Sequence, residues 1–152
     1  MDYIRLQVEI LKMWGKSNNN ADKQFRVARD MENNRMLIAP NGNCVFIIPV
    51  NDYLLNLPEF SSTPAFAPIL NIAKKEGVKV RGTGLTSGRG RDAYIQLDAG
   101  TFKVWINQQK LKLFGNPGFL TLVAYGELQP VFVYDVDWKI LLGVLAPARI
   151  KI

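Results

Sequence analysis

The sequence predicts an α+β fold that is built mainly from antiparallel strands. Short alternating or β-branched apolar runs recur along the chain, and turn-forming residues separate them. Helical periodicity is confined to a few short segments. The same order of elements, a strand, a helix and three strands, is predicted in residues 2–50 and again in residues 102–145. Since 152 residues correspond by default to one domain, we expect a single domain over residues 1–152, with an insertion at about 58–92.

The first unit begins with an ambiguous segment. Apolar residues alternate between positions 4 and 10 as in a strand, whereas Val8, Leu11 and Trp14 share a helical face. A short strand that leads into a helix satisfies both patterns. Asn41-Gly42 predicts a hairpin with a type I′ turn, because both central residues of that turn need a positive φ. The strands expected in this unit lie at residues 24–29, 35–39 and 44–50.

The segment between the two units contains the predicted insertion. Residues 50–57 are expected to form a short helix that Pro58 ends, and residues 65–75 a second helix. A short strand at 78–81 then leads into residues 82–91, where four glycines predict a mobile basic loop.

The second unit is rich in strands. Residues 93–97 and 102–106 are expected to pair as a hairpin. A short helix follows over residues 107–114, with Asn107 as its cap and Gly115 as its stop. Three further strands are expected at residues 119–124, 131–134 and 140–145.

The composition excludes several kinds of chemistry. The chain has no His and one Cys, which removes Ser-His and Cys-His nucleophile pairs, an internal disulfide and Cys-rich metal sites. Cys44 lies in an apolar run and is expected to be a small buried side chain. No stretch approaches the ~20 apolar residues of a membrane span. We therefore expect a cytoplasmic protein without enzymatic activity, cofactor, metal or membrane partner.

The excess of positive charge is local. The formal net charge is +6, and residues 74–91 contain six basic residues against one acidic residue. Clustered cations bind phosphates, and neighbouring glycines let backbone N–H groups approach them. The same residues are also compatible with a solvated loop that only aids solubility. The candidate nucleic-acid-binding residues of this stretch are Lys74, Lys75, Lys79, Arg81, Arg89 and Arg91.

Several segments together are similar to the DNA sliding clamps, the ring-shaped processivity factors of DNA polymerases. Pro-Val-Phe-Val at 130–133, followed by the Pro-x-Arg-containing stretch 143–150, resembles the end of a bacterial clamp. The strand and helix at 102–113 resemble the elements that precede that end. Ile-Ile-Pro at 47–49 with Tyr-Leu-Leu at 53–55 looks like another clamp element. Residues 58–92 have no clamp counterpart, and one-domain chains would need six copies to close a ring.

The resemblance implies that the helices face DNA. Lys12 and Lys16 in the first helix, and Lys110 and Lys112 in the second, would then contact phosphates, although an exposed helix often carries lysines for solubility alone. A homo-oligomer and a polymerase or another replication protein are the implied partners, besides DNA.

The expected function is therefore that of a non-enzymatic, clamp-like accessory protein that binds the nucleic-acid backbone without sequence specificity. The alternative is a structural or assembly protein of a phage or mobile element, in which the basic loop is incidental. Aromatic side chains can also stack on single-stranded bases, as in oligonucleotide-binding barrels, although their strand context favours packing. The aromatic candidates are Trp14, Trp105, Trp138, Tyr94 and Phe102.

Overall fold

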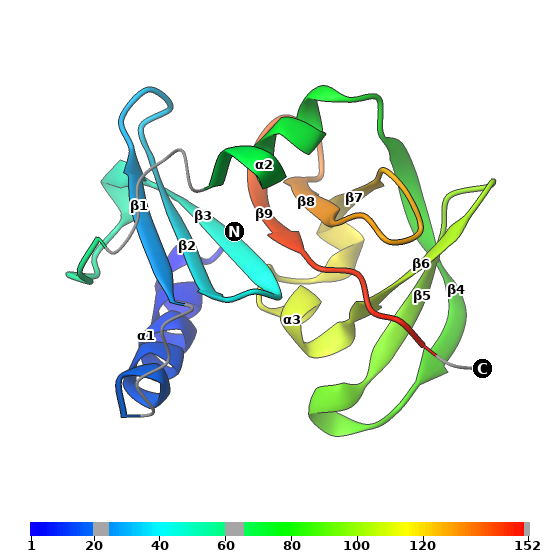
Figure 1. Ribbon diagram of the computed structural model, residues 1–152, viewed down its shortest axis with the longest axis horizontal. Coiled ribbons are helices and arrows are strands. Elements are labelled where there is room, and N and C mark those ends of the chain that lie inside the picture. The colour runs from blue at the N-terminus through cyan, green and yellow to red at the C-terminus, as the bar shows by residue number, and fades with distance from the viewer. Residues whose placement is uncertain (20–24, 60–65, 151–152) are drawn as a thin grey trace.

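A single twisted antiparallel sheet organises the protein in the computed structural model, which describes residues 1–19, 25–59 and 66–150 (Figure 1). Within these residues the sheet has nine strands in the order β1-β2-β3-β9-β8-β7-β4-β5-β6. Every pair of neighbouring strands is antiparallel. The prediction of an α+β fold with a mainly antiparallel sheet is therefore confirmed.

The strands form largely where apolar alternation and β-branched residues predict them. Eight of the nine agree with the expected segments to within a few residues, and β4 is much longer than expected. The strands are β1 (Arg26–Asp30), β2 (Arg35–Asn41), β3 (Cys44–Pro49), β4 (Val78–Ser87), β5 (Tyr94–Asp98), β6 (Lys103–Asn107), β7 (Leu120–Ala124), β8 (Val131–Asp135) and β9 (Leu141–Leu145).

The N-terminal segment is helical throughout, so the strand predicted at its start is wrong. Helix α1 spans Tyr3–Asn19, and it buries Leu6, Gln7 and Ile10, whereas Val8 and Leu11 are about half exposed. The amide of Gln7 explains this orientation. Its Nε2 donates to the Asp52 carbonyl at 2.8 Å, and its Oε1 accepts from the Leu54 backbone N–H at 2.7 Å. A pattern of apolar residues alone does not include this buried polar anchor.

The same anchor explains why the helix predicted at residues 50–57 does not form in full. Only a short 3-10 turn, Val50–Asp52, forms there. The Leu54 N–H donates to Gln7 instead of to a carbonyl four residues earlier, so the helix does not continue.

The hairpin between β2 and β3 forms as predicted, but the predicted type I′ turn is wrong. Asn41 pairs with Cys44, and neither Gly42 nor Asn43 has a positive φ.

Strand β4 replaces most of the predicted mobile loop at residues 82–91. It runs for ten residues, pairs with β7 through Val78–Val80, and pairs with β5 from Arg81 onward. The register shifts between Gly82 and Thr86, and Gly84 has φ +88°. Glycines in a strand often mark such a bulge, which lets one strand turn from one part of a sheet into another.

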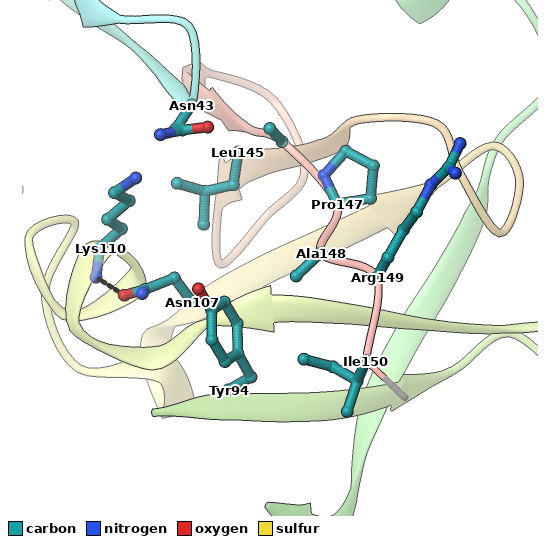
Figure 2. A pocket seen from close by; sticks show the side chains of 10 residues that line it. Asn43, Tyr94, Asn107, Lys110, Leu145, Pro147, Ala148, Arg149 and Ile150 are labelled. Carbon is teal, nitrogen blue, oxygen red and sulfur yellow. Dashed lines mark hydrogen bonds between the residues drawn. The ribbon is translucent and has the colours of Figure 1, made fainter. Parts of the chain in front are cut away.

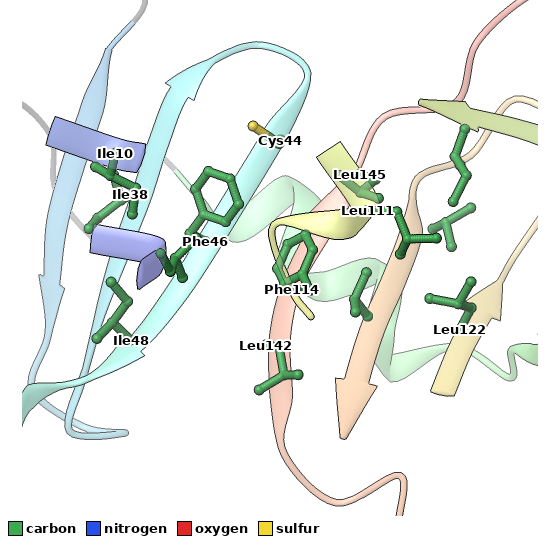
Figure 3. Close-up of a cluster of buried hydrophobic side chains, with 14 of the residues drawn as sticks. Ile10, Ile38, Cys44, Phe46, Ile48, Leu111, Phe114, Leu122, Leu142 and Leu145 are labelled. Carbon is green, nitrogen blue, oxygen red and sulfur yellow. The ribbon is translucent and has the colours of Figure 1, made fainter. Parts of the chain in front are cut away.

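Helices cover both faces of the sheet. Helix α1 and helix α3 (Gln108–Lys112) pack on one face, where Ile10, Phe46 and Phe114 are among the buried side chains (Figure 3). Helix α2 (Ala67–Leu70), extended by a 3-10 turn at Asn71–Lys74, packs on the other face, against a second apolar cluster around Phe66 and Phe132. Asn107 caps α3 as predicted, because its side chain accepts from the Lys110 N–H at 3.0 Å.

The strand order also has an internal symmetry. Read outward from the β3–β9 pair, each side is a three-stranded meander, β3-β2-β1 and β9-β8-β7. A helix precedes each meander in the chain, α1 in one case and α3 in the other, and both pack on the same face. A strand, β6, precedes only α3. The predicted repeat is therefore a helix and three strands, with the leading strand present once.

The sheet curls so that the chain after β9 lies beside the far edge strand. The Ala148 N–H donates to the Trp105 carbonyl at 2.8 Å. An antiparallel bridge between these two residues thus joins the segment after β9 to β6. Strands β4 to β9 thus enclose a core that includes Leu97, Ile106 and Leu122 (Figure 1). This contact brings residues 146–150 across the outer side of β6.

Asp30 stabilises the β1–β2 turn through a nearly buried carboxylate. Its oxygens accept from the Arg35 Nε at 3.0 Å and from the Asn33 Nδ2 at 2.9 Å. Burial raises the pKa of Asp30, but the hydrogen bonds and the Arg35 charge outweigh it, so this pKa lies below its ordinary value of 3.8. A carboxyl group with a lowered native pKa adds stability above its unfolded pKa, and that stability disappears as the pH falls through the native pKa.

We therefore expect Asp30→Asn to lower the urea midpoint at pH 7, and the difference from the wild type to vanish as the pH falls below about 3.8. Urea unfolding followed by circular dichroism between pH 2.5 and pH 7 measures this directly. Asp137→Asn, on an exposed turn, is the control and should behave like the wild type. A constant difference at all pH values would contradict the role assigned to the Asp30 charge.

Candidate nucleic-acid interface

Strands β4, β5 and β6 present alternate side chains on the outer side of the curled sheet. Val104 and Ile106 are buried in the core, so Lys103, Trp105 and Asn107 point the opposite way. The strand register places these three residues opposite partners on β5. Tyr94 pairs with Asn107, Gln96 with Trp105, and Asp98 with Lys103. Arg81 on β4 pairs with Asp98 in turn.

Three adjoining hollows follow this outer side. The first, of about 290 Å³, lies between Tyr94 and Lys110 on one side and the C-terminal segment 145–150 on the other (Figure 2). The second, of about 720 Å³, lies beyond residues 148–150 and is lined by Gln96 and Trp105 among others. The third, of about 640 Å³, is lined by residues of β4 and of the β5–β6 turn. Ala148, Arg149 and Ile150 line both of the first two hollows, and Gly100 and Lys103 line both of the last two.

We call this continuous surface the cationic groove, because five basic side chains line it: Lys79, Arg81, Lys103, Lys110 and Arg149. Asp98 and Glu127 are its acidic side chains. In the described part of the chain, none of the five cations lies within 4.0 Å of a carboxylate oxygen. Asp98 instead accepts from the Gly100 N–H at 2.8 Å. Among residues 1–19, 25–59 and 66–150, no carboxylate therefore neutralises the positive charge of the groove at short range.

Aromatic side chains accompany these cations. Trp105 and Tyr94 are half-buried on the outer side of β6 and β5. Trp138 lies at the Lys79 end, where the Lys79 Nζ is 4.8 Å from the centroid of its ring. The Asp135 carboxylate holds the turn that presents Trp138, since it accepts from the backbone N–H groups of Lys139 and Ile140.

The basic residues predicted between positions 74 and 91 do not form one cluster. Lys79 and Arg81 are the two that line the groove. Lys74 and Lys75 lie at the end of the α2 segment, and Arg89 and Arg91 follow β4. Because a ten-residue strand is roughly 30 Å long, the two ends of this stretch are well separated.

The predicted helix lysines are also divided between surfaces. Lys12 and Lys16 are exposed on α1, and the Lys12 Nζ lies 3.2 Å from a Glu9 carboxylate oxygen. Lys112 is exposed on α3, whereas Lys110 lines the first hollow of the cationic groove. The sheet face of Lys79 and Arg81 is the one opposite to α1 and α3, because their neighbour Val80 packs into the core with the helices.

Two of the five cations of the groove, Lys103 and Arg149, are not among the predicted binding residues. The position of Lys103 follows from the sequence pattern, because Lys103 alternates with Val104 in a predicted strand and therefore lies on the same side as Trp105. The position of Arg149 does not follow from a local pattern, because only the contact of Ala148 with β6 brings Arg149 into the groove. Of the remaining aromatic candidates, Trp14 packs edge-on against Phe25 with ring centroids 5.0 Å apart, as expected for a packing residue. Phe102 packs against the core, and it also lines the second hollow.

The described residues hold few groups poised for other chemistry. Cys44 is buried, as expected, and burial raises its pKa to about 11 despite the nearby Lys110 charge. Among residues 1–19, 25–59 and 66–150, no three His, Cys, Asp or Glu side chains are close enough to hold a metal ion together. No helix in these ranges has the length and apolar character needed to cross a bilayer.

Comparison of the chain with protein-family models, with curated proteins and with solved structures finds no match.

Proposed function

We propose that this protein is a non-enzymatic accessory protein that binds the phosphate backbone of nucleic acid, without sequence specificity, through the cationic groove. The observation that supports the proposal is the line of five basic side chains, for which the described residues offer no carboxylate partner at short range. Such cations gain affinity by displacing the counterions that surround phosphates. Phosphate contacts position a protein on nucleic acid without reading its sequence.

The helices do not favour base-specific recognition of duplex DNA. Recognition helices place several side chains along the major groove, whereas α3 spans only five residues and packs Leu111 into the core. Helix α1 presents Ile4, Val8 and Leu11 outward, which are 68%, 48% and 50% exposed. These apolar side chains offer nothing that hydrogen-bonds a base edge.

A clamp-like use of the fold is a second candidate. The symmetric order of the two meanders, with α1 and α3 on the same face, favours it. In that case DNA would contact Lys12, Lys16 and Lys112 from the helix side, and several copies would assemble around it with a replication protein as partner. The apolar side chains on the outer face of α1 favour a related alternative, a structural or assembly protein that associates through this helix.

The salt dependence of DNA binding tests the proposal. The slope of log affinity against log salt is about −0.7 for each phosphate contacted on a single strand and about −0.9 on a duplex. We expect the triple variant Arg81→Gln, Lys103→Gln and Arg149→Gln to lose about two units of slope on a labelled single strand, because three contacts disappear. Fluorescence anisotropy at several salt concentrations provides the measurement.

A variant with the same loss of charge is the control. Lys74→Gln, Lys75→Gln and Arg89→Gln remove three exposed cations outside the cationic groove, and the slope should stay at the wild-type value. Two results would count against the proposal. One is the absence of binding by the wild type at low salt, and the other is an equal loss of slope in both variants.

A further inference from the structure

Two aromatic side chains on neighbouring strands line the cationic groove, Trp105 in its second hollow and Tyr94 in its first. Trp105 lies directly opposite Gln96 in the β5–β6 register, and Tyr94 is two residues from Gln96 along β5. Trp105 and Tyr94 are thus diagonal neighbours on one face, and such side chains lie roughly 7–8 Å apart. Lys103 and Arg149 line the second hollow together with Trp105, and Tyr94 and Arg149 line the first.

The Gln96 side chain adds a polar group beside these rings. Gln96 is 7% exposed, and the Thr83 hydroxyl donates to its Oε1 at 2.9 Å. In the described part of the chain the Nε2 group of Gln96 has no hydrogen-bond partner, and this atom is not fully buried. Gln96 lines the second hollow with Trp105. A ligand there can therefore complete the hydrogen bonding of a nearly buried amide.

We propose that the ligand of the cationic groove is single-stranded nucleic acid, whose bases stack on Trp105 and Tyr94 while its phosphates contact Lys103 and Arg149. This inference rests on the proposed phosphate binding and adds the class of nucleic acid. Stacking on an aromatic side chain is tolerant of sequence, because every base has a π face. The Gln96 amide would then donate to, or accept from, the edge or sugar of a stacked nucleotide.

The arrangement favours a single strand over a duplex because of what each one exposes. In a duplex the faces of the bases are covered by their neighbours in the stack, so Trp105 and Tyr94 gain no contact from it. In a single strand the faces are free to stack on aromatic side chains. The C-terminal segment 146–150 pairs with Trp105 through Ala148 and lines the first two hollows, which suits an extended strand. Figure 2 shows this segment along the first hollow.

The test compares three labelled ligands that carry the same number of phosphates per strand: an oligothymidylate, an abasic strand and a duplex. At a fixed salt concentration we expect the wild type to bind the oligothymidylate roughly 10- to 100-fold more tightly than the abasic strand, because one or two stacked bases are lost in the latter. Trp105→Leu should reduce this preference by about fivefold or more, with an unchanged salt slope, because the base on Trp105 loses its contact whereas the base on Tyr94 keeps it. Trp105→Phe should keep most of the preference.

Phe119→Leu is the matched control, because Phe119 is an exposed aromatic side chain that lines none of the three hollows. Circular dichroism confirms that each variant is folded before it is measured. Equal affinity of the wild type for the oligothymidylate and the abasic strand would overturn the stacking inference, and so would tighter binding of the duplex. In both cases a salt-dependent affinity would leave the proposed phosphate binding intact, whereas the absence of all binding would remove both.

Discussion

Gly143→Ala is expected to destabilise the protein by about 3 kcal/mol, because a methyl group at this position has no space. Gly143 lies in β9 near the centre of the sheet, opposite Phe46 on one side and Val133 on the other. A Cβ atom there would collide with the Val45 carbonyl oxygen and with the Phe114 ring. Phe114 in turn packs against Phe46, with ring centroids 5.3 Å apart.

Neither neighbour of Gly143 can move freely. The Val45 carbonyl belongs to the backbone of β3, so its displacement disturbs the β3–β9 pairing. The Phe114 ring is 1% exposed and fills the space between α3 and the sheet (Figure 3). Interiors are close-packed, so an added methyl group forces strain rather than filling a void.

Urea unfolding followed by circular dichroism measures the effect of Gly143→Ala. Gly42→Ala is the control, because a Cβ at Gly42 has no atom within 4 Å and this glycine has no positive φ. The control should change the free energy of unfolding by about 0.5 kcal/mol or less. If both variants were as stable as the wild type, the packing described around β9 would be wrong.

Charge reversal on two different surfaces is expected to have very unequal effects on nucleic-acid affinity. Lys103→Glu with Arg149→Glu should weaken binding by about 100-fold or more at low salt, because two phosphate contacts become repulsive. Lys12→Glu with Lys16→Glu changes the net charge by the same amount but acts on the outer face of α1. We expect that variant to remain within about threefold of the wild type.

This pair of variants separates the groove from the clamp-like alternative. Both reduce the net charge equally, so long-range attraction falls to a similar extent in each. A larger loss in the α1 variant than in the groove variant would place the contact on the helix side, and would favour the clamp-like candidate. Anisotropy titrations with one oligonucleotide in one buffer are sufficient for the comparison.

Local patterns predicted the strands well and the helices less well. The second hairpin, β5 with β6, follows from alternation alone, and the capped helix α3 follows from Asn107 and Gly115. Helix α1 was misjudged because Gln7, a polar residue, occupies a buried position that it holds only through hydrogen bonds to residues 52–54. Such partners are distant in the chain, so no periodicity reveals them.

In the cationic groove, too, some features follow from local sequence patterns and others depend on residues distant in the chain. Lys79, Arg81, Lys103 and Trp105 lie on predictable outward positions of strands, because alternation is a local property of an extended backbone. Whether these side chains lie together on one surface, however, is not a local property. The charge excess of residues 74–91, read from the sequence as one basic loop, is spread along β4 and its flanks, and only part of it reaches the groove.

Residue types and short-range patterns are enough to predict the fold class, the positions of most strands, the absence of His-based chemistry and the excess of positive charge. Each of these depends on residue type and on neighbours in the chain. Which cations share a surface depends on the tertiary fold. Strand β4 leaves β7 after Val80 and pairs with β5 at Arg81, opposite Asp98. The bridge between Ala148 and Trp105 brings Arg149 into the hollow that Lys103 lines. Both contacts join residues far apart in sequence, and their formation depends on the closure of the whole sheet.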